Sequence, residues 1–333
     1  MKMGIKKLVK ILSVTFAVSA LICGVSIALE LPRLHAVSER QDYKESWSLP
    51  IPNEATLFIA VSDVHVKLEP YDGDTLDVRF VGERINVKDD YPRIEAFSES
   101  GEISIQEVEH PFTAGIKLDF FDVTNPQLKG TLTVRFPRET SFSQAPLRTY
   151  TGSLDINALT AGQVWLFARS GDITARDLNA QNLMSETSGG AQSFERLTVS
   201  QVMGFKSDSG EVAVVDGDVG SLTINTYDGD VTLTGLIDDA ALNVTTSSGR
   251  ITIGLTKTVP AQIKTYSGDV ALTLPRGLGF RYSFNTHSGR LRYDGEQTDR
   301  SINTRQFEGT VGEGGVLISV ETSSGDFEVN RAD

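Results

Sequence analysis

Carboxylates in a recurring turn phrase are the side chains of this sequence best suited to chemistry. Asp228, Asp230 and Asp269 flank glycines in the phrases Asp-Gly-Asp-Val at 228 to 231 and Ser-Gly-Asp-Val at 267 to 270. Such oxygens suit Ca²⁺, and carboxylates grouped on one face would suit a polysaccharide-processing enzyme. An aspartate that returns at one place of a repeating turn is, however, typical of a fold requirement. We therefore predict no catalytic residue and no cofactor, with these three aspartates as candidate calcium ligands and solvated turn carboxylates as the alternative.

Histidine and cysteine chemistry is not favoured by the sequence. The four histidines have no metal-ligand spacing: His35, His65, His110 and His287. The one cysteine, Cys23, lies within an apolar segment, which leaves no thiol for a disulfide or a zinc site elsewhere. The nonapeptide Gly-Gly-x-Gly-x-Asp of calcium-binding β-rolls does not occur either.

Two aromatic residues stand at equivalent turn positions. Tyr227 and Tyr266 each lie two residues before a recurring glycine, as His287 does. If the repeats stack on one another, the two tyrosines become neighbours on one side and could bind sugars or peptides. Packing of the turn explains them equally well, and both alternatives stay open.

The turns belong to an internal repeat. Its glycines follow one another at intervals of 19, 19, 20, 19, 20, 19, 21 and 36 residues: Gly152, Gly171, Gly190, Gly210, Gly229, Gly249, Gly268, Gly289 and Gly325. Apolar residues alternate with period two before and after each glycine, so each unit holds two short strands and has no room for a crossover helix. The sequence predicts an all-β fold, a parallel β-helix or β-solenoid with coils of about 19–21 residues.

Three positions of the repeat carry further expectations. The glycine itself is predicted to form a backbone corner with positive φ. The residue three places earlier is threonine in most copies, and stacking would line these hydroxyls up in a ladder. The residue after the glycine forms a row of charges, in which Arg250 falls between Asp230 and Asp269, and Arg290 directly follows Asp269. The 36-residue interval before Gly325 has room for two degraded repeat units of about 18 residues or for one long loop, and its content favours the loop.

The N-terminal part divides into four segments. Residues 1–10 carry four lysines and are expected in the cytoplasm, and the uncharged run from Ile11 to Leu29 is long enough for a transmembrane anchor, with a cleaved signal peptide as the alternative. Residues 30–43 read as a polar linker. Seven strands are predicted after the linker, at 55–61, 64–68, 76–80, 94–97, 103–108, 116–121 and 132–136. They make 44–140 an N-terminal β region that caps the repeat domain, 141–333.

The net charge restricts the partners. It is −13 for the whole chain and −17 after residue 10, which argues against nucleic acid and against unaided binding to anionic polymers. Cationic peptides, or divalent cations that bridge to anionic groups, are compatible with it.

Several phrases of the repeat carry a family resemblance. They are the Ser-Gly-Asp copies, Leu-Asn-Val-Thr-Thr at 242 to 246, Val-Arg-Phe-Pro at 134 to 137 and the run from Gly314 to Asp326. With them, residues 44 to 333 resemble the bacterial β-strand-repeat domains of unknown function known as "putative adhesins", often membrane-anchored. The resemblance implies a β-helix-like extracytoplasmic module and a role in adhesion or envelope sensing, and it offers no catalytic residues.

The expected function is thus non-catalytic: a single-pass protein of the cell membrane whose extracytoplasmic β repeat contacts a cell-wall or envelope component, a cationic peptide or a membrane-protein partner. A polysaccharide-processing β-helix enzyme and a scaffold for a membrane partner are the alternatives.

Overall fold

The computed structural model describes residues 40–87, 90–109, 127–236, 241–293, 299–303 and 306–332. Every regular element in these ranges is a β-strand, as the sequence predicts. The predicted anchor, 11–29, lies outside the described residues. Among the residues that are described, no helix has the length and apolar character needed to cross a membrane.

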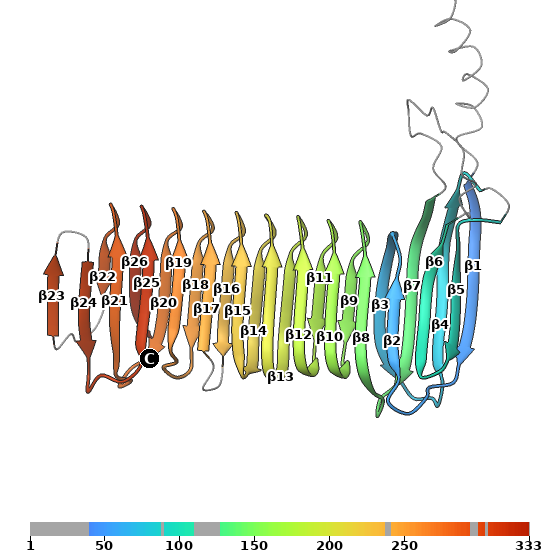
Figure 1. The fold of residues 1–333 in the computed structure, drawn as a ribbon, viewed down its shortest axis with the longest axis horizontal. Helices are drawn as coiled ribbons and strands as arrows, with labels where there is room; N and C mark the ends of the chain where they lie inside the picture. Colours follow the sequence, from blue (N-terminus) through green and yellow to red (C-terminus); the bar gives the residue numbers. More distant parts are fainter. Residues whose placement is uncertain are drawn as a thin grey trace, which may run out of the picture.

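The strands form one large mixed sheet that runs as an elongated row from β1 to β23 (Figure 1). The N-terminal strands are β1 (Arg40–Leu49), β2 (Thr56–Ala60), β3 (Asp63–Tyr71), β4 (Leu76–Ile85), β5 (Arg93–Glu99), β6 (Glu102–Val108) and β7 (Gln127–Pro137). The first repeat strands are β8 (Ser141–Thr149), β9 (Leu154–Asn157), β10 (Thr160–Ala168), β11 (Ile173–Arg176), β12 (Asn179–Thr187), β13 (Gln192–Ser207), β14 (Val212–Val219) and β15 (Ser221–Thr226). The remaining strands are β16 (Val231–Leu236), β17 (Ala241–Thr246), β18 (Ile251–Leu255), β19 (Ala261–Thr265), β20 (Val270–Pro275), β21 (Phe280–Thr286), β22 (Leu291–Tyr293), β23 (Asp299–Asn303), β24 (Gln306–Val311), β25 (Leu317–Thr322) and β26 (Phe327–Ala332).

Each repeat glycine lies in the turn between two strands, and we call such a pair a coil. The strand before the turn pairs in parallel with the strand before the turn of the next coil, as β17 does with β19, where Val244 faces Ile263. The strand after the turn does the same on the other side, as β18 does with β20, where Ile253 faces Leu272. The long strand β13 belongs to both rows of pairings. Equivalent residues of neighbouring repeat units therefore face each other, with register shifts at Ala180/Asn182 and at Thr234/Leu236.

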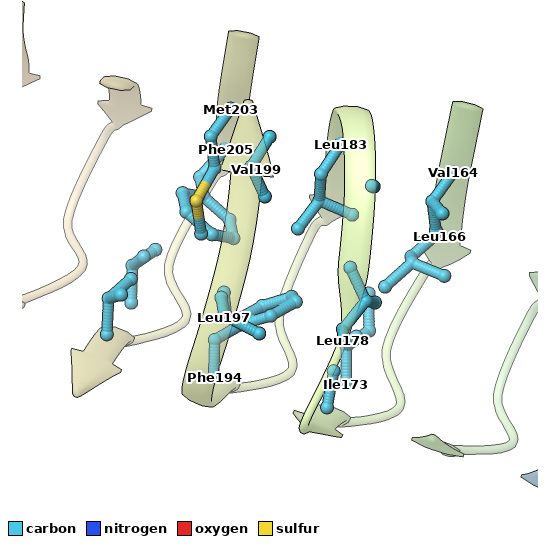
Figure 2. Packing of buried hydrophobic residues seen from close by; sticks show 14 of the residues in the cluster. Val164, Leu166, Ile173, Leu178, Leu183, Phe194, Leu197, Val199, Met203 and Phe205 are labelled. Atoms are coloured by element: carbon cyan, nitrogen blue, oxygen red, sulfur yellow. The ribbon is translucent and has the colours of Figure 1, made fainter. Parts of the chain in front are cut away.

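The strands that precede the glycine turns form one row, the strands that follow them form a second row, and the core lies between these two rows. Alternate side chains of both rows point inward and are buried, which is the period-two pattern of the sequence. Figure 2 shows this interior around β10 to β13, where the rings of Phe194 and Phe205 pack with their centroids 4.8 Å apart. Because each coil alone leaves its apolar side uncovered, coils must stack to bury it.

The N-terminal strands continue both rows and end them with antiparallel pairings. β2 pairs in parallel with β8, and β3 with β9. β4 pairs antiparallel with β1 and β7, and β5 antiparallel with β6. Six of the seven predicted N-terminal strands are confirmed, and the seventh, 116 to 121, lies outside the described residues. β1 begins at Arg40, inside the predicted linker. It pairs with β4 and is the edge strand at this end of the sheet.

The C-terminal coils do not stack in sequence order. β25 lies between β19 and β21, and β26 lies between β20 and β22, so the last coil of the chain is inserted before the preceding one. The 36-residue interval is not the predicted loop: it contains β23 and β24, which pair antiparallel with each other, and β24 pairs with β21. This hairpin extends the row beyond β21 and leaves β25 free to pair on both sides.

Candidate functional site

The turn side of the stacked coils brings together the residues singled out from the sequence. A methyl group on Gly249 would lie 1.9 Å from the carbonyl oxygen of Gly229, and one on Gly268 would lie 1.9 Å from that of Gly249. The same contact recurs along the repeat, and the row ends with Gly268, Gly325 and Gly289 in that order. None of the repeat glycines has the predicted positive φ. Glycine is required because the backbone of the neighbouring coil passes too close for a side chain.

The residue three places before the glycine closes the turn. The hydroxyl of Thr265 accepts a hydrogen bond from the backbone N–H of Gly268 at 2.9 Å, and Ser207 does the same for Gly210 at 2.8 Å. These hydroxyls are buried. They satisfy a buried donor of their own turn, which is a local role in each coil.

The aspartate after the glycine holds the next coil. Asp230 Oδ1 accepts the backbone N–H of Arg250 at 2.7 Å, and Asp269 Oδ1 accepts that of Asp326 at 2.9 Å. Asp326 in turn accepts the N–H of Arg290 at 2.8 Å. The predicted charge order is therefore wrong at its end, since Asp326 stands between Asp269 and Arg290. Each of these carboxylates has one oxygen engaged by backbone.

This role predicts different effects for two substitutions of one residue. Asp269→Ala leaves the N–H of Asp326 without its acceptor, and we expect it to lower the free energy of unfolding by about 1 kcal/mol. Asp269→Asn keeps an amide oxygen in the same place and is expected to melt like the wild type. Thermal unfolding of the three proteins, side by side, checks this. Equal losses for both variants would mean that the charge, and not the hydrogen bond, stabilises the turn.

The candidate calcium ligands lie along this edge in two turns, Asp228 and Asp230 in one and Asp269 in another, with the Gly249 turn between them. Asp228 accepts a hydrogen bond from Ser248, while Asp230 and Asp269 bind backbone as described. In the parts of the chain that the structure describes, no group of three or more histidine, cysteine, aspartate or glutamate side chains is placed to hold a metal ion. His65 lies in β3 and His287 at an exposed turn, so these two histidines are far apart in the row of strands.

The predicted aromatic neighbours are separated by one coil. Ser247 donates its backbone N–H to Tyr227 O at 2.9 Å, and Tyr266 donates its N–H to Ser247 O at 3.1 Å. The two tyrosine residues are highly exposed, at 64% for Tyr227 and 71% for Tyr266. The structure places both rings on one edge, with a serine turn between them.

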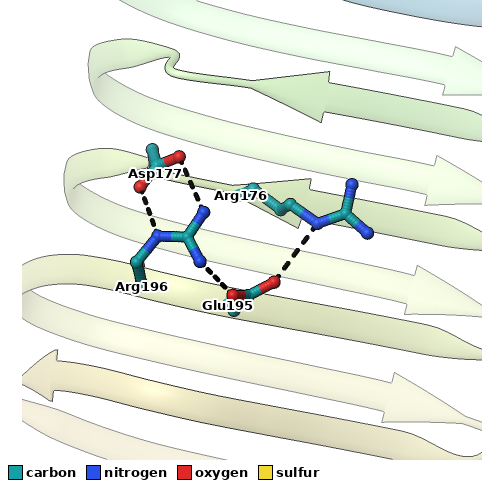
Figure 3. Close-up of polar contacts among 4 residues, drawn as sticks. All are labelled: Arg176, Asp177, Glu195 and Arg196. Carbon is teal, nitrogen blue, oxygen red and sulfur yellow. Dashed lines mark hydrogen bonds and ion pairs between the residues drawn. The ribbon is translucent and has the colours of Figure 1, made fainter.

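At the other end of the strands that follow the glycine turns, charged side chains link successive coils (Figure 3). Arg196 binds both carboxylate oxygens of Asp177, at 2.7 and 3.0 Å, and also contacts Glu195. Arg176 reaches the same Glu195 at 3.2 Å. The Arg196 guanidinium lowers the pKa of Asp177. Because these groups are exposed, the network contributes little to stability, and its charges are mutually neutralised.

One buried and one half-buried polar residue were not identified as sites from the sequence. Gln192 is fully buried in the core, where its Nε2 donates to Lys206 O at 2.9 Å. Glu107 follows Ile103 and Ile105 at the next alternate position of β6, and its Oε2 accepts the backbone N–H of Ser62 at 2.7 Å. Burial raises the pKa of Glu107 to about 7, with the charges of Glu109 and Asp63 adding to the effect and the Ser62 N–H opposing it. The alternation itself could have indicated a carboxylate on the inward side.

The fold and its turns define an all-β strand-repeat protein, in which the recurring turn phrase is explained by close contacts between neighbouring coils. Residues 55–330 match the family model described as "Toastrack DUF4097". The chain belongs to this family of domains of unknown function, as its resemblance indicates.

The chain also matches solved structures at low sequence identity. A "putative adhesin" from Parabacteroides distasonis is 12% identical, with 88% of this chain and 97% of that chain covered and a TM-score of 0.46. A "putative lipid binding protein" from the same species is 15% identical, with the same coverage and a TM-score of 0.45. A "putative adhesin" from Bacteroides fragilis is 9% identical, with 87% and 97% covered and a TM-score of 0.42. No curated protein matches the chain.

Proposed function

We propose that this chain is a non-catalytic, single-pass protein of the cell membrane whose extracytoplasmic β repeat binds a component of the cell envelope in adhesion. In this proposal residues 11–29 are the anchor, 30–43 begin the ectodomain, 44–140 cap it, and 141–333 form a parallel β-solenoid. The backbone contacts of the repeat glycines and aspartates support a stiff rod. Such a rod carries a long surface away from the membrane.

The observation that carries the non-catalytic part of the proposal is the engagement of the repeat carboxylates. Asp230 and Asp269 each hold the N–H of the next coil. A general acid or nucleophile would have to release such a bond or work through its second oxygen. Stacking explains why the same hydrogen bond, from a backbone N–H to an aspartate carboxylate, recurs at the same position of several coils.

An envelope-retention assay tests the adhesion role. The full-length chain is reconstituted in fluorescent liposomes, which are incubated with isolated cell envelopes, with calcium or with chelator. Saturable retention above that of empty liposomes is expected. Retention no greater than that of empty liposomes would overturn the proposal. Loss of retention with chelator would assign a role to calcium at the turn aspartates, and an unchanged value would remove them as candidates.

A second candidate, a scaffold for a membrane-protein partner, is favoured by an apolar row on the outer side of β10, β12 and β13. Trp165 faces Met184 in the pairing of β10 with β12. On the following strand Val202 faces Asn182, two residues before Met184. These side chains are 39%, 46% and 46% exposed. In membranes, a cross-linker attached to the new cysteine of Trp165→Cys would capture such a partner. If the protein acts in adhesion alone, this variant gives no cross-linked product.

A further inference from the structure

Planar rings occupy every second coil along one stretch of the turn edge. The residues two before the glycines are joined in order by backbone hydrogen bonds: Ser247 N–H to Tyr227 O at 2.9 Å, Tyr266 N–H to Ser247 O at 3.1 Å, Ser323 N–H to Tyr266 O at 3.0 Å, and His287 N–H to Ser323 O at 3.1 Å. Their order in space is thus Tyr227, Ser247, Tyr266, Ser323 and His287. We call these five residues the ring row.

The serines of the ring row keep the ring faces open. Tyr227 and Tyr266 have the largest exposed fractions of the exposed large apolar side chains, and His287 is exposed as well. Ser247 and Ser323 are half-buried between them. Adjacent coils lie about 4.8 Å apart, so rings on neighbouring coils would cover one another, whereas rings two coils apart lie about 10 Å from each other.

The inserted C-terminal coil makes this alternation regular. Ser323 belongs to the turn between β25 and β26, which lies between the turns that carry Tyr266 and His287. In sequence order His287 would follow Tyr266 directly. The insertion therefore supplies the small spacer and sets His287 at the same two-coil interval as the tyrosines.

The spacing and the chemistry of the ring row fit a sugar chain. A pyranose ring presents a face of C–H groups that packs on an aromatic face, and in an extended, β-linked polysaccharide every second sugar presents the same face. The two-sugar repeat of such a chain is close to two coil spacings. Asp228 and Ser267 directly follow the two tyrosines in the chain and are exposed, as Ser248 is. Ser248 donates to Asp228, and the remaining lone pairs of these oxygens suit sugar hydroxyls. The net charge of −13 disfavours an anionic polymer.

We infer that the ring row binds a neutral, extended, β-linked polysaccharide, with alternate sugars packed on Tyr227 and Tyr266 and the chain continuing toward His287. This inference names the ligand class of the proposed adhesion role and rests on it. Long chains bind through several equivalent contacts, so affinity depends on the length of the chain.

The test measures binding of the full-length protein in nanodiscs to neutral β-linked oligosaccharides of glucose and of N-acetylglucosamine, as di-, tetra- and hexasaccharides. Calorimetry is expected to show affinity rising about tenfold once the oligosaccharide spans two rings. Tyr227→Ala with Tyr266→Ala should abolish that rise. Ser247→Tyr should also reduce it, because a third ring would cover its neighbours while both original tyrosines remain.

Tyr150→Ala is the matched control. Tyr150 stands at the same turn position of an early coil, but its hydroxyl accepts a hydrogen bond from Arg148 at 2.8 Å and its exposure is only 40%. This variant should bind every oligosaccharide like the wild type. Binding that does not depend on the length of the oligosaccharide would overturn the inference. So would wild-type binding by the variant with Tyr227→Ala and Tyr266→Ala, provided that this variant melts like the wild type.

The envelope-retention assay separates this inference from the proposed function. If the double variant in liposomes is still retained on envelopes, adhesion stands and the ring row is not its site. If the wild type is not retained on envelopes either, the adhesion role itself fails. Loss of retention in the double variant alone supports both.

Discussion

Gly249→Ala is expected to lower the free energy of unfolding by about 3 kcal/mol or more, enough to leave little folded protein in a marginally stable domain. The new methyl group would lie 1.9 Å from Gly229 O, 2.5 Å from Gly229 C and 3.0 Å from Asp230 N. All three atoms are backbone, so no flexible side chain can move aside. The two coils would have to separate, and the parallel pairings on both sides of the turn would stretch. Urea unfolding followed by far-ultraviolet circular dichroism measures the loss.

Gly254→Ala is the matched control for this prediction. Gly254 lies in β18 of the same coil, and a methyl group there would meet its nearest atoms at 3.7 Å, an ordinary contact. We expect its unfolding free energy to stay within about 0.5 kcal/mol of the wild type, because alanine also restricts the unfolded chain. Comparable losses at positions 249 and 254 would contradict the close-approach explanation of the repeat glycines.

Periodicity in the sequence was sufficient to predict the coils. The apolar alternation before and after each glycine places pairs such as Val244 and Ile263 on equivalent strands, and the structure pairs them. The origin of the glycine was not predictable in the same way. A backbone corner and a close neighbour both favour glycine, and only the position of the next coil distinguishes them. The absence of positive φ at Gly249 decides for the neighbour.

The order of the last coils could not be obtained from turn phrases. The phrases around Gly289 and Gly325 are equivalent and fit either position beside Gly268. What decides is the hairpin of β23 and β24, which occupies the far side of β21 and sends the chain back to place β25 against β19. The order of residues in the ring row depends on this insertion of the last coil. From the sequence, Tyr227 and Tyr266 were expected as neighbours, although Ser247 of the Gly249 turn already stands between them in the chain. The second spacer, Ser323, follows only from the stacking order.

For Glu107, the local sequence pattern predicts the direction of the side chain, and only the tertiary structure determines its hydrogen-bond partner and its burial. Alternation after Ile103 and Ile105 indicates that its side chain points inward. Its partner, the N–H of Ser62, comes from the turn between β2 and β3, 45 residues away in the chain. The carbonyl oxygen of Ser62 accepts the backbone N–H of Tyr150 in the first repeat turn. The carboxyl therefore sits where the N-terminal strands meet the first coil. Burial at this junction is what changes its protonation.

Glu107→Gln is expected to stabilise the protein at pH 8 by up to about 3 kcal/mol and to remove a pH dependence of the wild type. The pKa of Glu107 is raised from 4.5 to about 7 in the folded protein. Between these values the folded state binds more protons than the unfolded state, so wild-type stability falls as the pH rises through this window and is level above it. Below pH 4.5 both states are protonated and the residue contributes no penalty. The glutamine oxygen can still accept the Ser62 N–H and carries no charge at any pH.

Urea unfolding at intervals from pH 4 to pH 8 measures this effect. The wild-type and Glu107→Gln curves should coincide near pH 4 and separate as the pH approaches 7, and this convergence at low pH is an internal control for effects of the substitution on packing. Glu107→Ala distinguishes the charge from the hydrogen bond, because it removes both: it should lose the pH dependence as well, yet gain less at pH 8, since the Ser62 N–H then lacks its acceptor. Parallel curves for the wild type and Glu107→Gln would show that the carboxyl is not held in the protonated form by the fold. A separation that develops between about pH 4.5 and 7 and stays constant above pH 7 would identify Glu107 as the group whose protonation stabilises the junction between the N-terminal strands and the repeat.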